Sequence, residues 1–191
     1  MRKIIYTTLF TLICSFAYSQ STNGKWYSET VRNGVRIQNS FPKGGPYKGK
    51  VENGYNYSYL VFFTRIVNET DKQLDMTLHF SGDSIAIPGS PNTYVKLFLP
   101  PDKMTMDKQH EFSYGVTELQ WLDQKTALDL SVRPNEDGLF YVVAVFYQTT
   151  AKAWEDERGG NRAELVLDGS DLYYRMKPQV DLMHCGTIDL K

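Results

Sequence analysis

The chain has 191 residues with 21 basic and 22 acidic side chains, a net charge of −1, and 14% aromatic residues. This length suffices for one domain with a packed core. A balanced charge without a basic block argues against nucleic-acid binding. After the N-terminal segment no run approaches the ~20 apolar residues of a membrane-spanning helix, so we expect no transmembrane segment in the mature chain.

Residues 1–19 have the layout of a secretory signal peptide. Arg2 and Lys3 precede an apolar run from Ile4 to Phe16, and the small residues Ala17 and Ser19 follow. This order of charge, apolar core and small residues is typical of a cleaved signal. We expect cleavage near Ser19-Gln20, export to the periplasm or the exterior, and a single domain over residues 20–191.

The two cysteines bear on lipid anchoring and on disulfides. Thr11 and Ile13 do not fit the positions before a lipidated cysteine, so we interpret Cys14 as part of the apolar signal rather than as an anchor. Only Cys185 survives cleavage, which excludes a disulfide within the mature chain. We interpret Cys185 as a small buried apolar residue, with pairing to a partner as the alternative.

Two neighbouring segments carry strong strand signals. Tyr59–Val67 is aromatic, β-branched and almost continuously apolar, which is typical of a strand covered on both faces. In residues 74–80 apolar and polar side chains alternate, which predicts one buried and one exposed face, with His79 on the exposed one. The intervening residues 68–73 favour a turn. We therefore predict that the two segments form an antiparallel hairpin.

Similar patterns recur along the rest of the chain. Further strands are predicted at Tyr94–Leu99, Leu128–Val132, Leu139–Tyr147, Ala163–Leu167 and Leu172–Met176. Turns are predicted at Asn33-Gly34, Asn53-Gly54, Asp137-Gly138 and Asp168–Asp171. Roughly nine short strands with turns between them predict an all-β fold, an antiparallel β-sandwich of Ig-like or jelly-roll-like form. A long connection from Pro100 to Thr126 has room for a short helix from Thr117 to Asp123.

The sequence shows no complete motif for catalysis or metal binding. Gly44–Lys50 matches the first seven positions of a phosphate-binding loop, but Val51 replaces the required hydroxyl residue and prolines interrupt the segment, so we interpret it as a basic loop. The histidines His79, His110 and His184 lack zinc-site spacing, and no Gly-x-Ser-x-Gly elbow occurs. His184 and Cys185 should point to opposite faces of a strand. We assign no catalytic residue, metal ligand or cofactor.

Acidic residues in two turns are candidate calcium ligands. Asp168, Ser170 and Asp171 form one set, and Glu136 with Asp137 forms another. Calcium takes six to eight oxygen ligands, and each turn offers only a few. The same residue types are favoured in turns for backbone reasons, which is the interpretation we adopt.

Tyr55, Tyr57 and Tyr59 are the candidate ligand-binding residues. Their spacing of two places the three phenol rings on one face of a strand. Exposed rings in a row can stack on sugars or form a protein interface. The alternative is that they pack beneath a loop or the neighbouring sheet.

The expected function is that of a secreted, non-catalytic binding or accessory module of a bacterial envelope, which recognises a protein or a glycan. One alternative is a hydrolase acting on glycan or peptidoglycan, with two carboxylates converging from separate strands. Another is a structural subunit that completes an envelope assembly through its edge strands.

Overall fold

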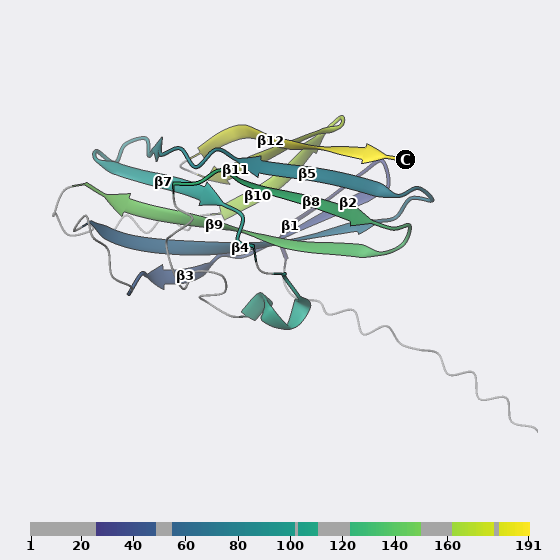
Figure 1. Ribbon diagram of the computed structural model, residues 1–191, viewed down its shortest axis with the longest axis horizontal. Coiled ribbons are helices and arrows are strands. Elements are labelled where there is room, and N and C mark those ends of the chain that lie inside the picture. Colours follow the sequence, from purple (N-terminus) through teal and green to yellow (C-terminus); the bar gives the residue numbers. More distant parts are fainter. Residues whose placement is uncertain (1–25, 49–54, 102, 111–122, 150–161, 178–179) are drawn as a thin grey trace, which may run out of the picture.

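Two antiparallel sheets pack face to face in the computed structural model, as Figure 1 shows. The structure describes residues 26–48, 55–101, 103–110, 123–149, 162–177 and 180–191. The prediction of an all-β antiparallel sandwich is confirmed. The expected signal peptide, residues 117–122 of the expected helix and the Asn53-Gly54 turn lie outside the described residues.

The first sheet is built around two long strands, β4 and β9. Its order is β1-β2-β4-β9-β7-β6, and β3 lies beside β4 on the same edge as β2. The strands are β1 (Trp26–Arg32), β2 (Val35–Ser40), β3 (Lys43–Pro46), β4 (Asn56–Asn68), β6 (Ile85–Ala86), β7 (Thr93–Phe98) and β9 (Asp137–Gln148).

The second sheet has the order β10-β11-β12-β5-β8. Its strands are β5 (Leu74–Phe80), β8 (Thr126–Val132), β10 (Arg162–Asp168), β11 (Asp171–Lys177) and β12 (Val180–Leu190). The predicted turn between β10 and β11 is confirmed: Asp168 pairs with Asp171, and Gly169 has a φ of 62°.

The predicted hairpin between residues 59–67 and 74–80 is wrong, because β4 and β5 belong to different sheets. Both edges of β4 are occupied by strands distant in sequence. The fully buried Asn68 stabilises the connection between the two sheets. Its Nδ2 donates to the carbonyl oxygens of Lys72 at 2.7 Å and Val132 at 2.9 Å. Its Oδ1 accepts from the amide of Thr70 at 3.1 Å. The turn itself forms as predicted, but it carries the chain to the other sheet.

Two glycine-containing predictions also need correction. Gly138 lies inside β9 rather than in a turn, and a Cβ added there would lie 2.6 Å from Leu130 Cδ2. The residue with the turn conformation is Asn135, with a φ of 60°. Gly44 belongs to strand β3, not to a loop, and its Cβ would lie 1.9 Å from the carbonyl oxygen of Tyr59. Both glycines permit a close approach between strands.

The predicted turn at Asn33-Gly34 is confirmed, with φ values of 50° and 75° that join β1 to β2. In the described part of the long connection after Pro100, residues 106–110 form a short 3-10 helix, η1 (Met106–His110), which the sequence did not predict. Among the residues described, no helix is long and apolar enough to span a membrane.

Two hydrophobic cores result from the alternation of side chains along β4 and β9. The main core lies between the sheets, and the second covers the outer face of the first sheet. Both faces of β4 are therefore buried, as its composition predicts. The second core comprises Tyr57, Val61, Phe63, Phe98, Met104, Tyr141, Val143 and Val145.

The alternating pattern of residues 74–80 is confirmed in β5, with His79 exposed and the apolar residues buried. In β12, His184 is exposed while Cys185 is fully buried in the main core. Burial raises the pKa of the Cys185 thiol to about 12. The interpretation of Cys185 as a buried apolar residue is thus confirmed.

Candidate functional site

A row of tyrosines crosses three strands at one end of the outer face of the first sheet. Tyr57 in β4 pairs with Tyr147 in β9, and Tyr147 pairs with Tyr94 in β7. Tyr55, just before β4, also stacks on Tyr147. We call these four residues the tyrosine ladder.

The rings of the ladder are nearly parallel and close. Ring centroids lie 5.5 Å apart for Tyr57 and Tyr147, 5.4 Å for Tyr94 and Tyr147, and 6.0 Å for Tyr55 and Tyr147. The interplanar angles are 27°, 23° and 10° respectively. Parallel rings at this spacing are offset-stacked, so they cover parts of each other's faces and leave ring edges for outside contacts.

The four rings of the ladder differ in how deeply they are buried. Tyr57 is only 7% exposed and belongs to the second core, while Tyr55, Tyr94 and Tyr147 are partly buried. The Tyr147 hydroxyl lies 2.7 Å from Oγ of Ser84, an exposed residue before β6. The buried ring of Tyr57 therefore fixes the position of the row, and the other three rings supply its accessible surface.

The three tyrosines predicted from the sequence all pack in or against the second core, but their roles differ. Tyr57 and Tyr55 join the ladder. Tyr59 lies in the next row, where it pairs with Val145 and, on its other side, with Gly45. Among the described residues, no atom would lie within 4 Å of a Cβ on Gly45, the residue opposite Tyr59.

Tyr94 and Tyr147 are candidate residues that sequence reasoning missed. Both lie in segments predicted as strands, and their positions within those strands were available from alternation. Their convergence depends on the order and register of β4, β9 and β7, which no local pattern contains. A charged group lies on the same face: Lys96, two residues after Tyr94, is 12% exposed along its side chain and forms an ion pair with the exposed Asp123.

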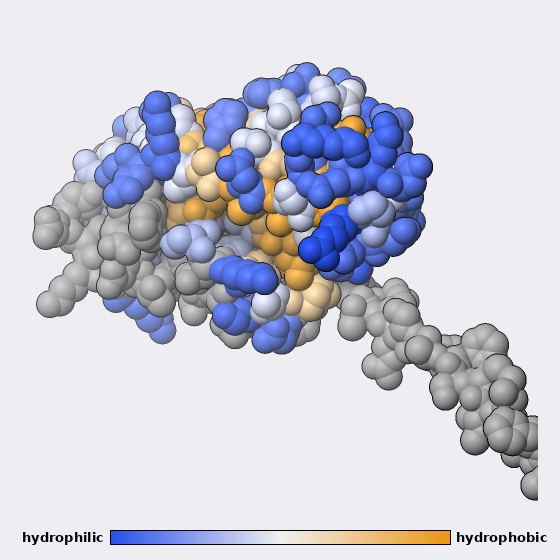
Figure 2. All heavy atoms as spheres, turned by 45° about the vertical axis from the view of Figure 1, so that its right-hand side comes forward, coloured by the Kyte–Doolittle hydropathy of each residue, from blue (hydrophilic) through white to orange (hydrophobic). Residues whose placement is uncertain are grey.

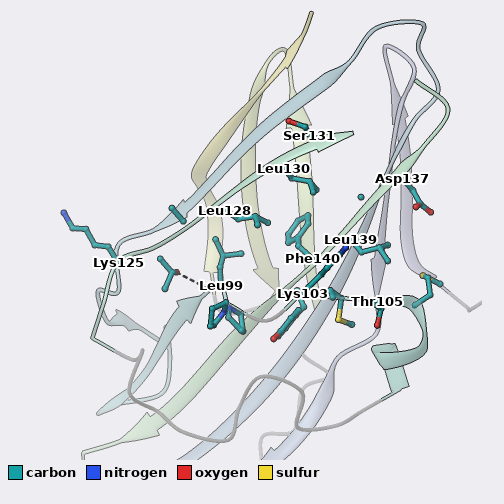
Figure 3. A pocket seen from close by; sticks show the side chains of 18 of the residues that line it. Leu99, Lys103, Thr105, Lys125, Leu128, Leu130, Ser131, Asp137, Leu139 and Phe140 are labelled. Carbon is teal, nitrogen blue, oxygen red and sulfur yellow. Dashed lines mark hydrogen bonds between the residues drawn. The ribbon is translucent and has the colours of Figure 1, made fainter. Parts of the chain in front are cut away.

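A cleft of about 770 Å³ opens between β8 and the first half of β9. In Figure 3, Leu128, Leu130 and Phe140 point into it, Lys125 lies at one end and Asp137 at the other. Residues 99–101 and 103–106 border it as well. Figure 2 shows a band of apolar residues between hydrophilic ones on one face of the molecule. Among the described residues that line the cleft, Asp137 is the one carboxylate, and its oxygen lies 2.5 Å from the guanidinium of Arg65.

The remaining sequence candidates do not form a metal site in the described part of the chain. His79 and His184 approach with ring centroids 6.2 Å apart, and His184 Nε2 lies 3.3 Å from Asp171. Within the described ranges no group of three or more histidine, cysteine or acidic residues could hold a metal ion. The turn carboxylates form ion pairs instead: Asp168 with Arg32, and Glu136 with Arg133.

The part of the phosphate-loop match that lies in the structure runs from Gly44 to Lys48, and Gly49, Lys50 and Val51 lie outside the described residues. Gly44, Gly45 and Pro46 are paired with β4. These residues form an edge strand, and Pro46 has no N–H to donate, whereas a phosphate-binding loop leads directly into a helix whose N–H groups face the phosphate. The side chain of His110 is also outside what the structure describes.

Comparisons with protein-family models, with curated proteins and with solved structures found no match to this chain.

Proposed function

We propose that this chain is a non-catalytic binding module of a bacterial envelope and that it recognises a protein partner through the tyrosine ladder. The observation that carries the proposal is the direct register of Tyr57, Tyr147 and Tyr94 across three strands. A rigid sheet holds these rings in fixed positions, so little conformational entropy is lost when they bind.

The stacking geometry favours a protein over a sugar at this surface. A sugar that stacks on tyrosine needs an uncovered ring face, and in the ladder Tyr147 has neighbouring rings at 5.4 and 5.5 Å. The gap between such rings is too narrow for a third ring. Ring edges instead suit the mostly apolar contacts at the centre of a protein interface, where tyrosine is enriched.

The hydrolase alternative depends on two carboxylates in one cleft. The cleft between β8 and β9 contributes Asp137, which is bound to Arg65. Two nitrogens of the Arg65 guanidinium contact the same oxygen, Oδ2, so the charge of this carboxylate is compensated and one of its oxygens is occupied. We therefore favour binding over hydrolysis as the role of this fold.

The test compares the wild-type protein with Tyr94→Ala and Tyr147→Phe. Tyr173→Ala is the matched control, because Tyr173 is also a partly buried strand tyrosine but lies in the second sheet. Each protein is used as bait in an envelope extract of the source organism and is screened in parallel on a glycan array. We expect a defined protein partner that the wild type and Tyr173→Ala capture and that Tyr94→Ala and Tyr147→Phe lose.

Melting temperatures of all variants must be compared alongside binding, because only folded variants are informative. Equal capture by all four proteins would contradict the proposal. Selective binding on the glycan array that depends on Tyr94 would show that the surface recognises sugars instead.

A further inference from the structure

In the described part of the chain, no strand pairs with the outer edge of β8. The Gln73 carbonyl accepts a hydrogen bond from Lys191 at the end of β12, at 2.9 Å. Because successive residues of a strand direct N–H and C=O to opposite sides, the odd-numbered residues of β5 bond to β12 and the even-numbered ones to β8. The register pairs Met76 with Leu130 and Leu78 with Leu128.

It follows that the even-numbered residues of β8 bond to β5, while Ala127, Asp129 and Ser131 direct their N–H and C=O away from the sheet. β8 is the last strand of its sheet, and no described strand pairs with this edge. Ala127 and Ser131 line the cleft although their side chains are exposed. The cleft is therefore bounded by an open strand edge.

A second edge borders the same cleft. The Thr149 amide donates to the Asn92 carbonyl at 3.0 Å, so odd-numbered residues of β9 face β7. Pairing between these two strands ends at Phe98 and Val143. Leu139 lies beyond the last paired residue and lines the cleft. The floor between the two edges is apolar, formed by side chains that include Leu128, Leu130 and Phe140.

We propose that the cleft binds an extended peptide segment of a partner protein, which adds to the second sheet as a strand beside β8. Its backbone bonds to Ala127, Asp129 and Ser131, and alternate side chains enter the cleft. The volume of about 770 Å³ lies within the usual range for ligand pockets. This site goes beyond the proposed function, because its residues differ from those of the tyrosine ladder.

The charges along β8 predict where charged residues lie in the bound segment. Asp129 lies on the exposed face at the centre of β8, so a basic residue suits the position opposite it. Lys125 lies at the end where β8 begins, so a carboxylate suits that end (Figure 3). For an antiparallel strand, the segment then reads polar, apolar, basic, apolar, polar, apolar, acidic from its N-terminus.

The same charge argues against a second copy of this chain as the occupant. The two-fold pairing of β8 with β8 that is centred on Asp129 joins the outward groups of Ala127 and Ser131 to each other. It places the two Asp129 carboxylates directly opposite each other, which is unfavourable. A heterologous segment with a basic residue at this position removes the repulsion.

The probe is a seven-residue synthetic peptide with the sequence threonine, valine, lysine, valine, threonine, valine, glutamate, with blocked termini. Binding is measured by titration calorimetry with the full mature chain, and amide hydrogen exchange is followed by NMR. We expect saturable binding and protection of the amides of Ala127, Asp129 and Ser131 by the peptide.

Charge exchange provides the specificity test. Asp129→Lys should weaken binding of the lysine peptide by about tenfold, and a peptide with glutamate in place of that lysine should recover the loss on the variant. Asp168→Lys is the matched control, since it makes the same charge change on β10, at the opposite edge of the sheet. It should bind the lysine peptide like the wild type.

Asp129→Pro removes one outward N–H and the side-chain bond from the exposed Thr77 hydroxyl but leaves the backbone hydrogen bonds of β8 to β5 in place, so it should lose binding and keep its fold. If Asp129→Pro unfolds, the charge-exchange experiment still tests the proposal. The proposal is overturned if the peptide does not bind at about 1 mM, a free energy near −4 kcal/mol. It is also overturned if binding leaves the three amides unprotected or if sedimentation shows that the cleft is closed in a dimer.

Discussion

The side-chain oxygen of Asn39 accepts a hydrogen bond from the backbone amide of Leu165 at 3.0 Å, which joins the first sheet to the edge strand of the second. Asn39 lies in β2 and Leu165 in β10, and they are 3% and 1% exposed. The Thr64 hydroxyl donates to the same oxygen at 3.2 Å. One buried amide thus satisfies polar groups from both layers.

Replacement of Asn39 by alanine should lower the free energy of unfolding by about 2 kcal/mol, because the buried Leu165 amide loses its acceptor. Urea titration measures the loss. Asn56→Ala, at an exposed position of β4, serves as the control and should change stability by no more than about 0.5 kcal/mol. Equal losses for both variants would show that the buried bond contributes nothing specific.

A second prediction concerns pH. Hydrogen bonds from Lys191, Ser131 and Gln73 hold the pKa of Asp75 well below its ordinary range. The Lys191 ammonium lies 2.6 Å from one carboxylate oxygen, and the Ser131 hydroxyl lies 2.6 Å from the other. Since the pKa in the folded state is depressed, the stabilisation is present above the ordinary aspartate value near 4 and is lost as the pH falls below it.

Thermal melts of the wild type and Asp75→Asn between about pH 2 and pH 6 test this point. We expect the wild type to melt higher at pH 6 and the difference to shrink as the pH falls. A difference that stays constant over this range would mean that the charge of Asp75 plays no part in stability.

Local patterns predicted which face a residue occupies better than which strand lies beside it. Leu74, Met76 and Leu78 alternate with polar residues and are buried as expected, because a half-buried strand imposes that period. Tyr55 and Tyr57 share a face for the same reason. Prediction of the ladder would have required the pairing register of Tyr147 and Tyr94, which is set by contacts between segments far apart in sequence.

The missed strands had weak signals. β1 shows no alternation of burial, because it is an edge strand with its last four residues exposed. β3 consists of lysine, two glycines and proline, a composition depleted in strands. It pairs with β4 because Gly44 permits the backbones to approach closely. β12 contains Gly186 at a similarly close contact, where a Cβ would lie 1.8 Å from the Thr77 oxygen.

The reactivity of the Cys185 thiol reports on unfolding of the protein. Its thiol is fully buried and its pKa is raised to about 12, so almost none of it is thiolate at pH 8. We expect no reaction with an aromatic disulfide reagent in the native protein and complete reaction of this thiol in denaturant. Rapid labelling of the native protein at pH 8 would show that β12 opens locally.

Tyr57 and Tyr55 should respond differently to truncation although they are two residues apart. Tyr57 is 7% exposed in the second core and stacks on Tyr147, so Tyr57→Ala should cost about 3 kcal/mol of unfolding free energy. Tyr55 is only partly buried and precedes β4, so Tyr55→Ala should cost clearly less. Denaturant titrations of both variants, with Tyr57→Phe to separate the ring from its hydroxyl, measure these costs. Tyr57→Phe should retain most of the stability, because the stacked ring stays in place. If Tyr57→Ala unfolds at the wild-type midpoint, Tyr57 is not a support of the ladder and the surface must be held by β9 and β7 alone.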